Sequence, residues 1–290
     1  MERRVITTTT GPVEIVLVPG PRPPVLFFPG GHCSAMCDCG WEVYTRLGFG
    51  TVSFSRPEYG ETHVGALSPE LFVRQVREVC EQLDISAVAA AVGVSFGGMQ
   101  AVHAAGDPAL GVPRLVLHGC APSSLPYPDS RLQAIGAPVL FSPLLQGLVW
   151  RLVRRLVGSE AGLRRVMAGL SNLPVDAWWN KLDLADKTEL RVLFRTMSSD
   201  SGFANDLRQG RARDAADRQG AMSRVRCPTL VTGSRHDGGV SFEHAVDFAD
   251  VIPNAALIEL DSPNHIFWIG PGRAELRSVV AAFMGESSCE

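Results

Sequence analysis

The sequence predicts an α/β fold, in which helices flank a mostly parallel β-sheet and a further helical segment is inserted between two strands. Short runs rich in β-branched and aromatic residues alternate with helical patterns along most of the chain. One of them, at residues 85–92, is an apolar run of the kind that forms a strand buried on both faces of a parallel sheet. Residues 122–222, by contrast, carry helical patterns and no convincing strand.

Seven strands are expected, each followed by a turn signal or a helical pattern. They lie at residues 13–18, 25–28, 51–55, 85–92, 115–118, 229–232 and 257–260. The clearest helix start is Ser68-Pro69-Glu70, with Ser as the cap, Pro at the first helical position and Glu in the first turn. The apolar side of this helix is expected to carry Leu71, Val73, Val76, Val79, Cys80 and Leu83. Further helices are expected at residues 40–47 and from Phe96 to a stop at Gly106.

The segment at residues 122–222 carries four helical stretches, at residues 144–157, 161–170, 185–197 and 202–213. The first stretch is amphipathic and basic, with Arg151, Arg154 and Arg155 beside Leu148 and Leu152. Such a helix can touch a membrane surface or a partner. Packing on the core with a solvated arginine face is the interpretation that we favour.

The composition excludes several classes of protein. The chain has 27 Lys and Arg against 30 Asp and Glu, a net charge of −3, so a nucleic-acid-binding surface is not expected. Its 290 residues allow one large domain or two smaller ones. Residues 85–106 and 132–150 lack charged side chains, but the glycines of the first and Pro138 and Pro143 in the second argue against membrane spans.

The cysteines indicate a reducing compartment rather than a metal site. Seven cysteines cannot all pair, and the N-terminal residues lack the apolar run of a secretory signal, so we expect a cytoplasmic protein with reduced thiols. His32, Cys33, Cys37 and Cys39 form a cluster whose Cys-x3-Cys-x-Cys spacing differs from the paired Cys-x2-Cys of structural zinc. We therefore expect no metal and no cofactor, and the role of these cysteines is left open.

The first motif that carries chemistry is Gly-Val-Ser-Phe-Gly at residues 93–97. Alone it is weak, because G-x-S-x-G should arise by chance about 0.2 times in a chain of this composition. Its context is specific, however, since a buried strand precedes Ser95 and a helix follows. A sharp strand-to-helix turn exposes the Ser95 hydroxyl, and the Phe96 N–H then lies at a helix start, where negative charge is stabilised.

A serine nucleophile needs a base, which must itself be oriented. Asp237 follows the strand at residues 229–232, and His265 follows the strand at residues 257–260. Both are expected at the carboxyl edge of the sheet, where ligands bind in open α/β folds. Asp261 is a rival acid, but it lies only four residues before His265 and fits better in the turn.

The chain order Ser95…Asp237…His265 resembles that of the α/β-hydrolase superfamily, in its cap-bearing branch with a serine nucleophile. The Phe-Phe-Pro-Gly-Gly-His run at residues 27–32 is similar to the family's oxyanion loop. The Arg-Pro-Glu-Tyr-Gly-Glu-Thr run at residues 56–62 is similar to its turn after the fourth strand. Residues 233–237 resemble its acid loop, and residues 264–265 its base loop, so the resemblance covers almost the whole chain.

This resemblance implies an α/β-hydrolase fold with a core at residues 1–121 and 223–290 and an inserted helical cap at residues 122–222. It also implies that Ser95 is the nucleophile, that His265 is the general base and then acid, and that Asp237 orients the imidazole. The backbone N–H groups of Phe96 and Gly31 would form the oxyanion hole.

Two departures from the family pattern affect these assignments. Pro29 stands where the family usually has His, and Gly31-His32-Cys33 replaces its common apolar sequence, so His32 is an alternative oxyanion donor to Gly31. Glu58 replaces the usual Gly of the turn, which would bend that loop differently.

Other side chains are weaker candidates for a substrate pocket. His118 ends a strand at the active edge and could face the pocket. The tryptophans Trp178, Trp179 and Trp268 could line an apolar pocket or belong to the core. Among the remaining histidines, His103 is expected to pack within its helix and His236 to lie in a loop, whereas His63 and His244 have no informative context.

The resemblance implies a hydrolase acting on an ester, thioester or lactone of a mostly apolar small molecule, which a carrier protein or peptide could also present. A serine at the elbow argues against dehalogenase and epoxide hydrolase activities, which use Asp there in this family. Acyl transfer to another acceptor, C–C bond hydrolysis and ligand binding without turnover are the alternatives that the same residues permit.

Overall fold

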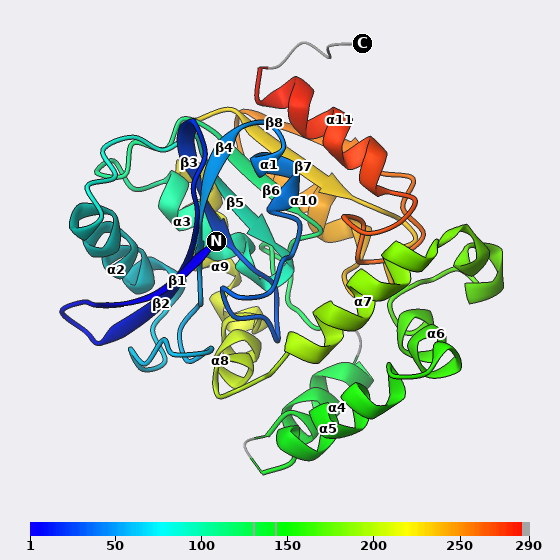
Figure 1. Cartoon of the computed structure of the whole chain (residues 1–290). Helices are drawn as coiled ribbons and strands as arrows, with labels where there is room; N and C mark the ends of the chain where they lie inside the picture. Colours follow the sequence, from blue (N-terminus) through cyan, green and yellow to red (C-terminus); the bar gives the residue numbers. More distant parts are fainter. Residues whose placement is uncertain (130, 143, 286–290) are drawn as a thin grey trace.

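The computed structural model describes residues 1–129, 131–142 and 144–285, so residues 130, 143 and 286–290 lie outside it. It contains an eight-stranded sheet in the order β1-β2-β4-β3-β5-β6-β7-β8 (Figure 1). The strands are β1 (Glu2–Thr7), β2 (Pro12–Val18), β3 (Arg22–Phe28), β4 (Phe49–Phe54), β5 (Ala90–Val94), β6 (Leu115–His118), β7 (Thr229–Gly233) and β8 (Ala255–Glu259). Pairs β1–β2 and β2–β4 are antiparallel and the other pairs are parallel, which confirms the mostly parallel sheet.

Two strands show the largest differences from the prediction, and each difference has an identifiable reason. The strand expected at residues 85–92 is β5, which begins only at Ala90. Val88 and Ala89 lie in the connection before β5 but are buried in the two hydrophobic clusters that cover the sheet, which accounts for their apolar character. No strand is predicted at β1, because most of its side chains are exposed and lack an alternating apolar pattern.

Helices cover both faces of the sheet, and their packing shows in the side chains of β3. Val25 and Phe27 belong to the hydrophobic cluster that includes α1 (Glu42–Thr45) and α11 (Arg273–Phe283). Leu26 and Phe28 belong to the cluster that includes α2 (Pro69–Gln82), α3 (Gly98–Ala105) and α10 (Phe242–Val251). Alternating side chains thus enter two buried layers, which is why the strand reads as a continuous apolar run.

The predicted start of α2 is confirmed, since the Ser68 side chain accepts the N–H of Leu71 (3.3 Å). Leu71 itself is not on the buried side: it is 40% exposed, and the adjacent Phe72 is fully buried instead. The sequence patterns also gave no indication of α10 or α11.

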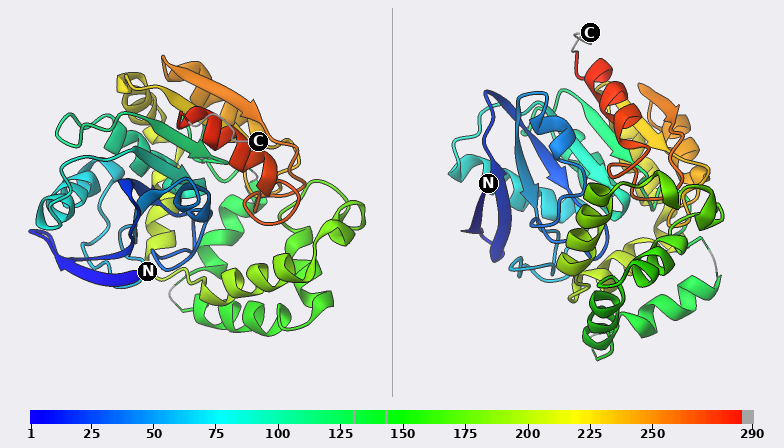
Figure 2. Two further views of the ribbon diagram at one scale, coloured as in Figure 1. Left: turned by 45° about the horizontal axis from the view of Figure 1, so that its top comes forward. Right: turned by 45° about the vertical axis from the view of Figure 1, so that its right-hand side comes forward.

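Residues between β6 and β7 form a helical segment, most of which lies to one side of the sheet, away from α2 (Figures 1 and 2). Its last helix packs instead against α3 and α10. Its helices are α4 (Arg131–Leu140), α5 (Gln146–Leu156), α6 (Glu160–Ala168), α7 (Leu184–Thr196), α8 (Gly202–Gln209) and α9 (Ala215–Arg224). Leu163 of α6 and Leu190 of α7 share a hydrophobic cluster with Phe267 of the sheet-bearing part of the chain. The segment is therefore packed on the core rather than loosely tethered to it.

Helix α5 faces the core differently from the prediction. Leu148 and Leu152 are 60% and 56% exposed, whereas Trp150, on the opposite side of the helix, is buried. One arginine is turned inward, since Arg154 donates to the carbonyls of Arg195 (3.1 Å) and Met197 (3.0 Å). Arg151 and Arg155 are exposed, as the favoured interpretation expects, but the outward face carries Leu148 and Leu152 as well.

Within the described ranges, no helix is both long enough and apolar enough to cross a bilayer. The two charge-free stretches lie elsewhere: residues 85–106 include β5 and α3, and residues 132–150 include parts of α4 and α5, with Pro143 outside the described residues.

Candidate active site

Ser95 lies at a sharp turn between β5 and α3, in a short 3-10 helix, η1 (Ser95–Gly97). Its φ is 50°, a left-handed conformation that costs a non-glycine residue about 1–2 kcal/mol. The flanking glycines are required by space: a Cβ at Gly97 would lie 2.0 Å from the Phe28 carbonyl oxygen, and one at Gly93 would lie 2.7 Å from Gly98 Cα. The turn is therefore held in a strained conformation by close backbone packing on both sides.

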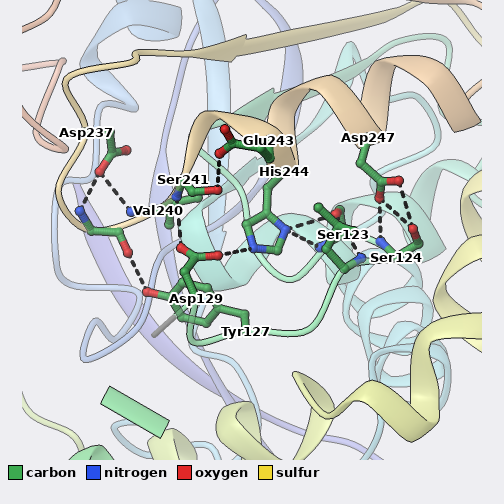
Figure 3. A network of polar contacts seen from close by, with 12 residues as sticks. Ser123, Ser124, Tyr127, Asp129, Asp237, Val240, Ser241, Glu243, His244 and Asp247 are labelled. Atoms are coloured by element: carbon green, nitrogen blue, oxygen red, sulfur yellow. Dashed lines mark hydrogen bonds and ion pairs between the residues drawn. The ribbon is translucent and has the colours of Figure 1, made fainter. Parts of the chain in front are cut away.

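Asp237 and His265 follow β7 and β8, and their side chains meet: His265 Nδ1 donates to Asp237 Oδ2 over 2.6 Å. The other oxygen, Asp237 Oδ1, accepts the N–H groups of Gly239 (2.7 Å) and Val240 (2.9 Å) (Figure 3). A carboxylate only accepts, so the neutral imidazole carries its proton on Nδ1 and leaves Nε2 as an acceptor.

Burial and charge act in opposite directions on His265. Burial lowers the pKa of the imidazole, while the charge of Asp237 and its hydrogen bond raise that pKa by more. The resulting pKa lies above the usual value for His. His265 is thus a stronger base than a free imidazole, and its protonated form is stabilised by Asp237.

Ser95 and His265 line one cavity of about 330 Å³. Gly31, His32 and Phe96 line it as well. The helical segment contributes a mostly apolar wall, made by Ala137, Trp150, Val166, Leu170, Phe194 and Met197. The described lining residues include no Asp, Glu, Lys or Arg, so this cavity favours an uncharged, apolar group.

The structure separates the two alternatives for the second oxyanion donor. The N–H of His32 donates to Tyr59 Oη (3.3 Å), and its ring Nδ1 contacts Ser199 Oγ (2.8 Å). Burial, together with the charge of Arg56, lowers the pKa of His32 to about 3, so the ring is neutral near pH 7. With the His32 N–H bound elsewhere, Gly31 is the better candidate to act with Phe96.

Glu58 adopts the conformation expected of the glycine that it replaces, with φ at 66°. Its side chain also accepts the N–H of Gly65 (2.9 Å), and its carbonyl accepts that of Gly202 (3.0 Å). The turn after β4 is therefore held by Glu58 through both its side chain and its carbonyl, and a different bend from the family's turn stays a prediction.

His118 does not line the cavity that contains Ser95. Its ring nitrogens are bound to Tyr44 Oη (2.8 Å) and Thr232 Oγ1 (2.8 Å) inside the core, because this position of β6 points into the layer that holds α1. Burial lowers its pKa to about 3. It is a hydrogen-bonded core histidine.

The three tryptophans are also placed outside that cavity. Trp178 and Trp179 pack against each other, with ring centroids 6.1 Å apart, in the hydrophobic cluster between α6 and α7. Trp268 packs on Phe267 (5.5 Å between centroids) and lines a different cavity beside α1 and α7. All three belong to the core, the second of the two interpretations that the sequence allows.

The rival acid, Asp261, is exposed, and its backbone N–H donates to Glu275 (2.8 Å). The cysteines Cys33, Cys37 and Cys39 are buried free thiols, and Cys37 Sγ lies 3.5 Å from Thr196 Oγ1. In the part of the chain that the structure describes, no group of three or more His, Cys, Asp or Glu side chains is arranged to hold a metal ion.

Two groups of residues that sequence reasoning missed hold the loops that carry Asp237 and His265. The Leu170 carbonyl accepts the N–H groups of both Gly238 (3.0 Å) and His265 (3.0 Å). Next to it, Asn172 Nδ2 donates to the Asp237 carbonyl (2.7 Å). The helical segment thereby ties the two loops to each other.

The second group is a polar network around the buried His244 (Figure 3). His244 Nδ1 contacts Ser123 Oγ (2.9 Å) and Nε2 contacts Asp129 Oδ1 (2.9 Å). Asp129 also accepts the Ser241 N–H (3.0 Å), and Tyr127 Oη donates to the Gly239 carbonyl (2.7 Å). The start of the helical segment therefore anchors the loop that follows Asp237.

Known proteins resemble this chain along nearly its whole length. A family model described as "Alpha/beta hydrolase family" matches residues 15–273. A Bacillus subtilis protein described as "Uncharacterized hydrolase YcgS" is 28% identical over 289 residues, which cover 98% of this chain and 99% of the relative.

Solved structures are similar over nearly the whole chain. An alpha/beta hydrolase fold protein from Nakamurella multipartita matches with a TM-score of 0.75 and 22% identity, covering 98% of this chain and 99% of that one. The enol-lactonase from Burkholderia xenovorans matches with a TM-score of 0.66 and 18% identity, covering 98% and 100%. A thermophilic esterase from Thermogutta terrifontis matches with a TM-score of 0.68 and 18% identity, covering 98% of each chain.

Proposed function

The chain belongs to the alpha/beta hydrolase family and is a hydrolase, and from this premise we propose that it is a serine hydrolase using Ser95, His265 and Asp237. Its substrate is an ester, thioester or lactone of a mostly apolar small molecule. The observation that carries this proposal is the shared cavity: Ser95 and His265 line it together, and Asp237 binds the imidazole over 2.6 Å from behind.

The proposed reaction has two steps. Ser95 Oγ attacks the substrate carbonyl while His265 Nε2 takes the hydroxyl proton, and the same imidazole then gives that proton to the leaving group. Asp237 stabilises the imidazolium that forms in between. Water next attacks the acyl-enzyme while His265 takes its proton, and the imidazole returns that proton to Ser95 Oγ as the ester bond breaks. The N–H groups of Phe96 and Gly31 bind the oxyanion in both steps, and each such donor is typically worth about 10²–10³ in turnover.

The substrate class follows from the cavity. A volume of about 330 Å³ with an apolar wall suits a small acyl group or ring. An esterase and an enol-lactonase are among the proteins of similar fold, which is consistent with an ester or lactone at this site. We propose that residues 122–222 form a cap, because they supply that wall and the Leu170 carbonyl that holds both loops.

Labelling with a fluorophosphonate tests the nucleophile. The wild-type chain should label once, Ser95→Ala should not label, and hydrolysis of short p-nitrophenyl esters should be lost with the labelling. Ser223→Ala is the control and should still label, because Ser223 is exposed and its hydroxyl donates only to the Gln219 carbonyl of its own helix (2.8 Å). A folded wild-type chain that neither labels nor hydrolyses any ester, thioester or lactone of graded chain length would refute the proposal.

A further inference from the structure

The guanidinium of Arg56 is fully buried at the junction of three parts of the chain. Its Nε donates to the Pro29 carbonyl (2.9 Å) and its Nη2 to the Gly30 carbonyl (2.9 Å), both in the loop after β3. Nη1 and Nη2 also donate to the two carboxylate oxygens of Asp206 in α8. Arg56 thus binds the proposed oxyanion loop and the helical segment at the same time.

Tyr59 completes this arrangement. Its hydroxyl donates to Asp206 Oδ2 (2.6 Å) and accepts the N–H of His32 (3.3 Å). The Arg56 guanidinium lies over the Tyr59 ring, 4.8 Å from its centroid. We refer to Arg56, Tyr59 and Asp206 as the Arg56 clamp.

The clamp sets the direction of one backbone donor. The Gly30 carbonyl and the Gly31 N–H belong to the same planar peptide, and in a trans peptide these two bonds point in opposite directions. Because Arg56 holds the carbonyl, the Gly31 N–H is turned away from Arg56. Ser95 is close to this peptide, since a Cβ built at Gly30 would lie 3.1 Å from Ser95 Cβ, and Gly31 lines the Ser95 cavity.

The charge of Arg56 is compensated from a distant part of the chain. Burial is the largest single influence and lowers the pKa of Arg56, but the charge of Asp206, the neighbouring Tyr59 and the hydrogen bonds to both together raise that pKa by more, so the guanidinium stays charged. Asp206 is 150 residues away in the sequence and is itself buried. A buried charge left without its partner is strongly destabilising. The loop that carries Gly31 is therefore fully supported only when α8 is docked.

We propose that Arg56 and Asp206 are positioning residues for acyl transfer at Ser95, holding the Gly30–Gly31 peptide so that the Gly31 N–H faces the developing oxyanion. The inference rests on the proposed serine hydrolase function. It adds residues that do not touch the substrate, and it makes docking of the helical segment a condition for a complete oxyanion hole.

Two variants test the clamp. Arg56→Met combined with Asp206→Leu removes both buried charges together, a replacement that is often neutral for stability when volumes are similar. Arg56→Lys keeps a positive charge beside Asp206 but lacks the planar fork that reaches two carbonyls and a carboxylate. Arg273→Met is the matched control, because Arg273 also joins the helical segment to the core, through Asp186 (3.3 Å) and Glu189, without touching the loop after β3.

The clamp predicts a specific kinetic effect. In both test variants kcat for a p-nitrophenyl ester should fall by about 10²-fold, the lower end of the effect of losing a donor, with KM changed less than about threefold. The affinity of benzeneboronic acid, whose tetrahedral adduct on Ser95 needs the same donor, should fall by a similar factor. Arg273→Met should leave both values within about twofold.

The proposed positioning role would be refuted by a double variant that has a near wild-type melting temperature and an unchanged kcat. It would also be refuted if Arg56→Lys had the kcat of the wild-type chain. If the wild-type chain neither labels nor turns over, the serine hydrolase proposal fails instead. A crystal structure of the double variant then decides: a rotated Gly30–Gly31 peptide supports the clamp, and an unchanged one refutes it.

Discussion

Replacing Asp237 by Asn tests the proposed pairing of acid and base. The substitution keeps the size of the side chain but removes the charge from a 2.6 Å hydrogen bond to His265 Nδ1. An amide can present its NH₂ group to Nδ1, which favours the wrong imidazole tautomer. In serine hydrolases of another fold this change lowers kcat by about 10⁴-fold, which corresponds to about 5 kcal/mol of transition-state stabilisation. We expect a loss of that order for Asp237→Asn.

The pH profile gives a second, independent measure of the same interaction. His265 must be neutral to act as base, so kcat/KM should rise with pH through its pKa, with a midpoint above the usual value because Asp237 raises that pKa. In Asp237→Asn the raising charge is lost and burial, which lowers the pKa, remains. The acidic limb of the residual activity should therefore move to lower pH.

Asp261→Asn is the matched control, because Asp261 precedes the base on the same loop but is exposed. Steady-state hydrolysis of a p-nitrophenyl ester between pH 5 and 9 measures both variants. A loss smaller than about tenfold in Asp237→Asn, or a larger loss in Asp261→Asn, would refute the assignment of the acid.

Three further predictions concern stability. Gly97→Ala should not give a folded chain, because its Cβ would lie 2.0 Å from the Phe28 carbonyl oxygen. Gly147→Ala should raise the free energy of unfolding by about 0.5–1 kcal/mol, because the added Cβ in α5 has open space around it. Urea denaturation compares the two variants with the wild-type chain. Leu148→Ser should change that free energy by less than about 0.5 kcal/mol, since the side chain is 60% exposed, and a loss above about 2 kcal/mol would show that it is buried. The pKa of His118 falls to about 3 on folding, so below about pH 6.5 the unfolded chain binds a proton that the folded chain does not. The free energy of unfolding should therefore decrease by about 1.4 kcal/mol per pH unit as the pH falls. His118→Gln should lack this contribution when urea titrations are compared between pH 7 and 5.

The residues proposed for chemistry are recognisable in the sequence because each accompanies a local signal. Ser95 is flanked by glycines at which an added Cβ would clash with the backbone, and Asp237 and His265 follow runs of strand-forming residues. Such signals depend on a few neighbouring positions, so they can be recognised in a single sequence. The mostly parallel sheet is predictable for the same reason.

The direction of a side chain is harder to predict than the element that carries it. The strand 115–118 has the predicted bounds, yet His118 points into the core and bonds with Tyr44 and Thr232, which come from two other elements. Leu148 and Leu152 lie on a predicted helix but on its exposed side. In each case the neighbouring elements determine which face is buried, and a local sequence pattern carries no information about those neighbours.

The residues that hold the loops leave almost no trace in the sequence. Leu170 contributes its carbonyl, a group that every residue has, so its side chain gives no signal of the bonds to Gly238 and His265. His244 and Asp129 are 115 residues apart, so nothing near either of them indicates the contact. Only the tertiary structure brings such partners together.

These contacts change how the helical segment should be understood. It touches all three loops of the proposed reaction: Asp206 reaches the oxyanion loop through Arg56, Tyr127 holds the loop after Asp237, and the Leu170 carbonyl joins the acid and base loops. A segment that only covered the cavity could be shortened with an effect on substrate choice alone. Since this one also supports the proposed catalytic geometry, its removal should lower kcat for every substrate, and variation in substrate preference should be sought in its cavity wall, at positions such as Val166 and Phe194.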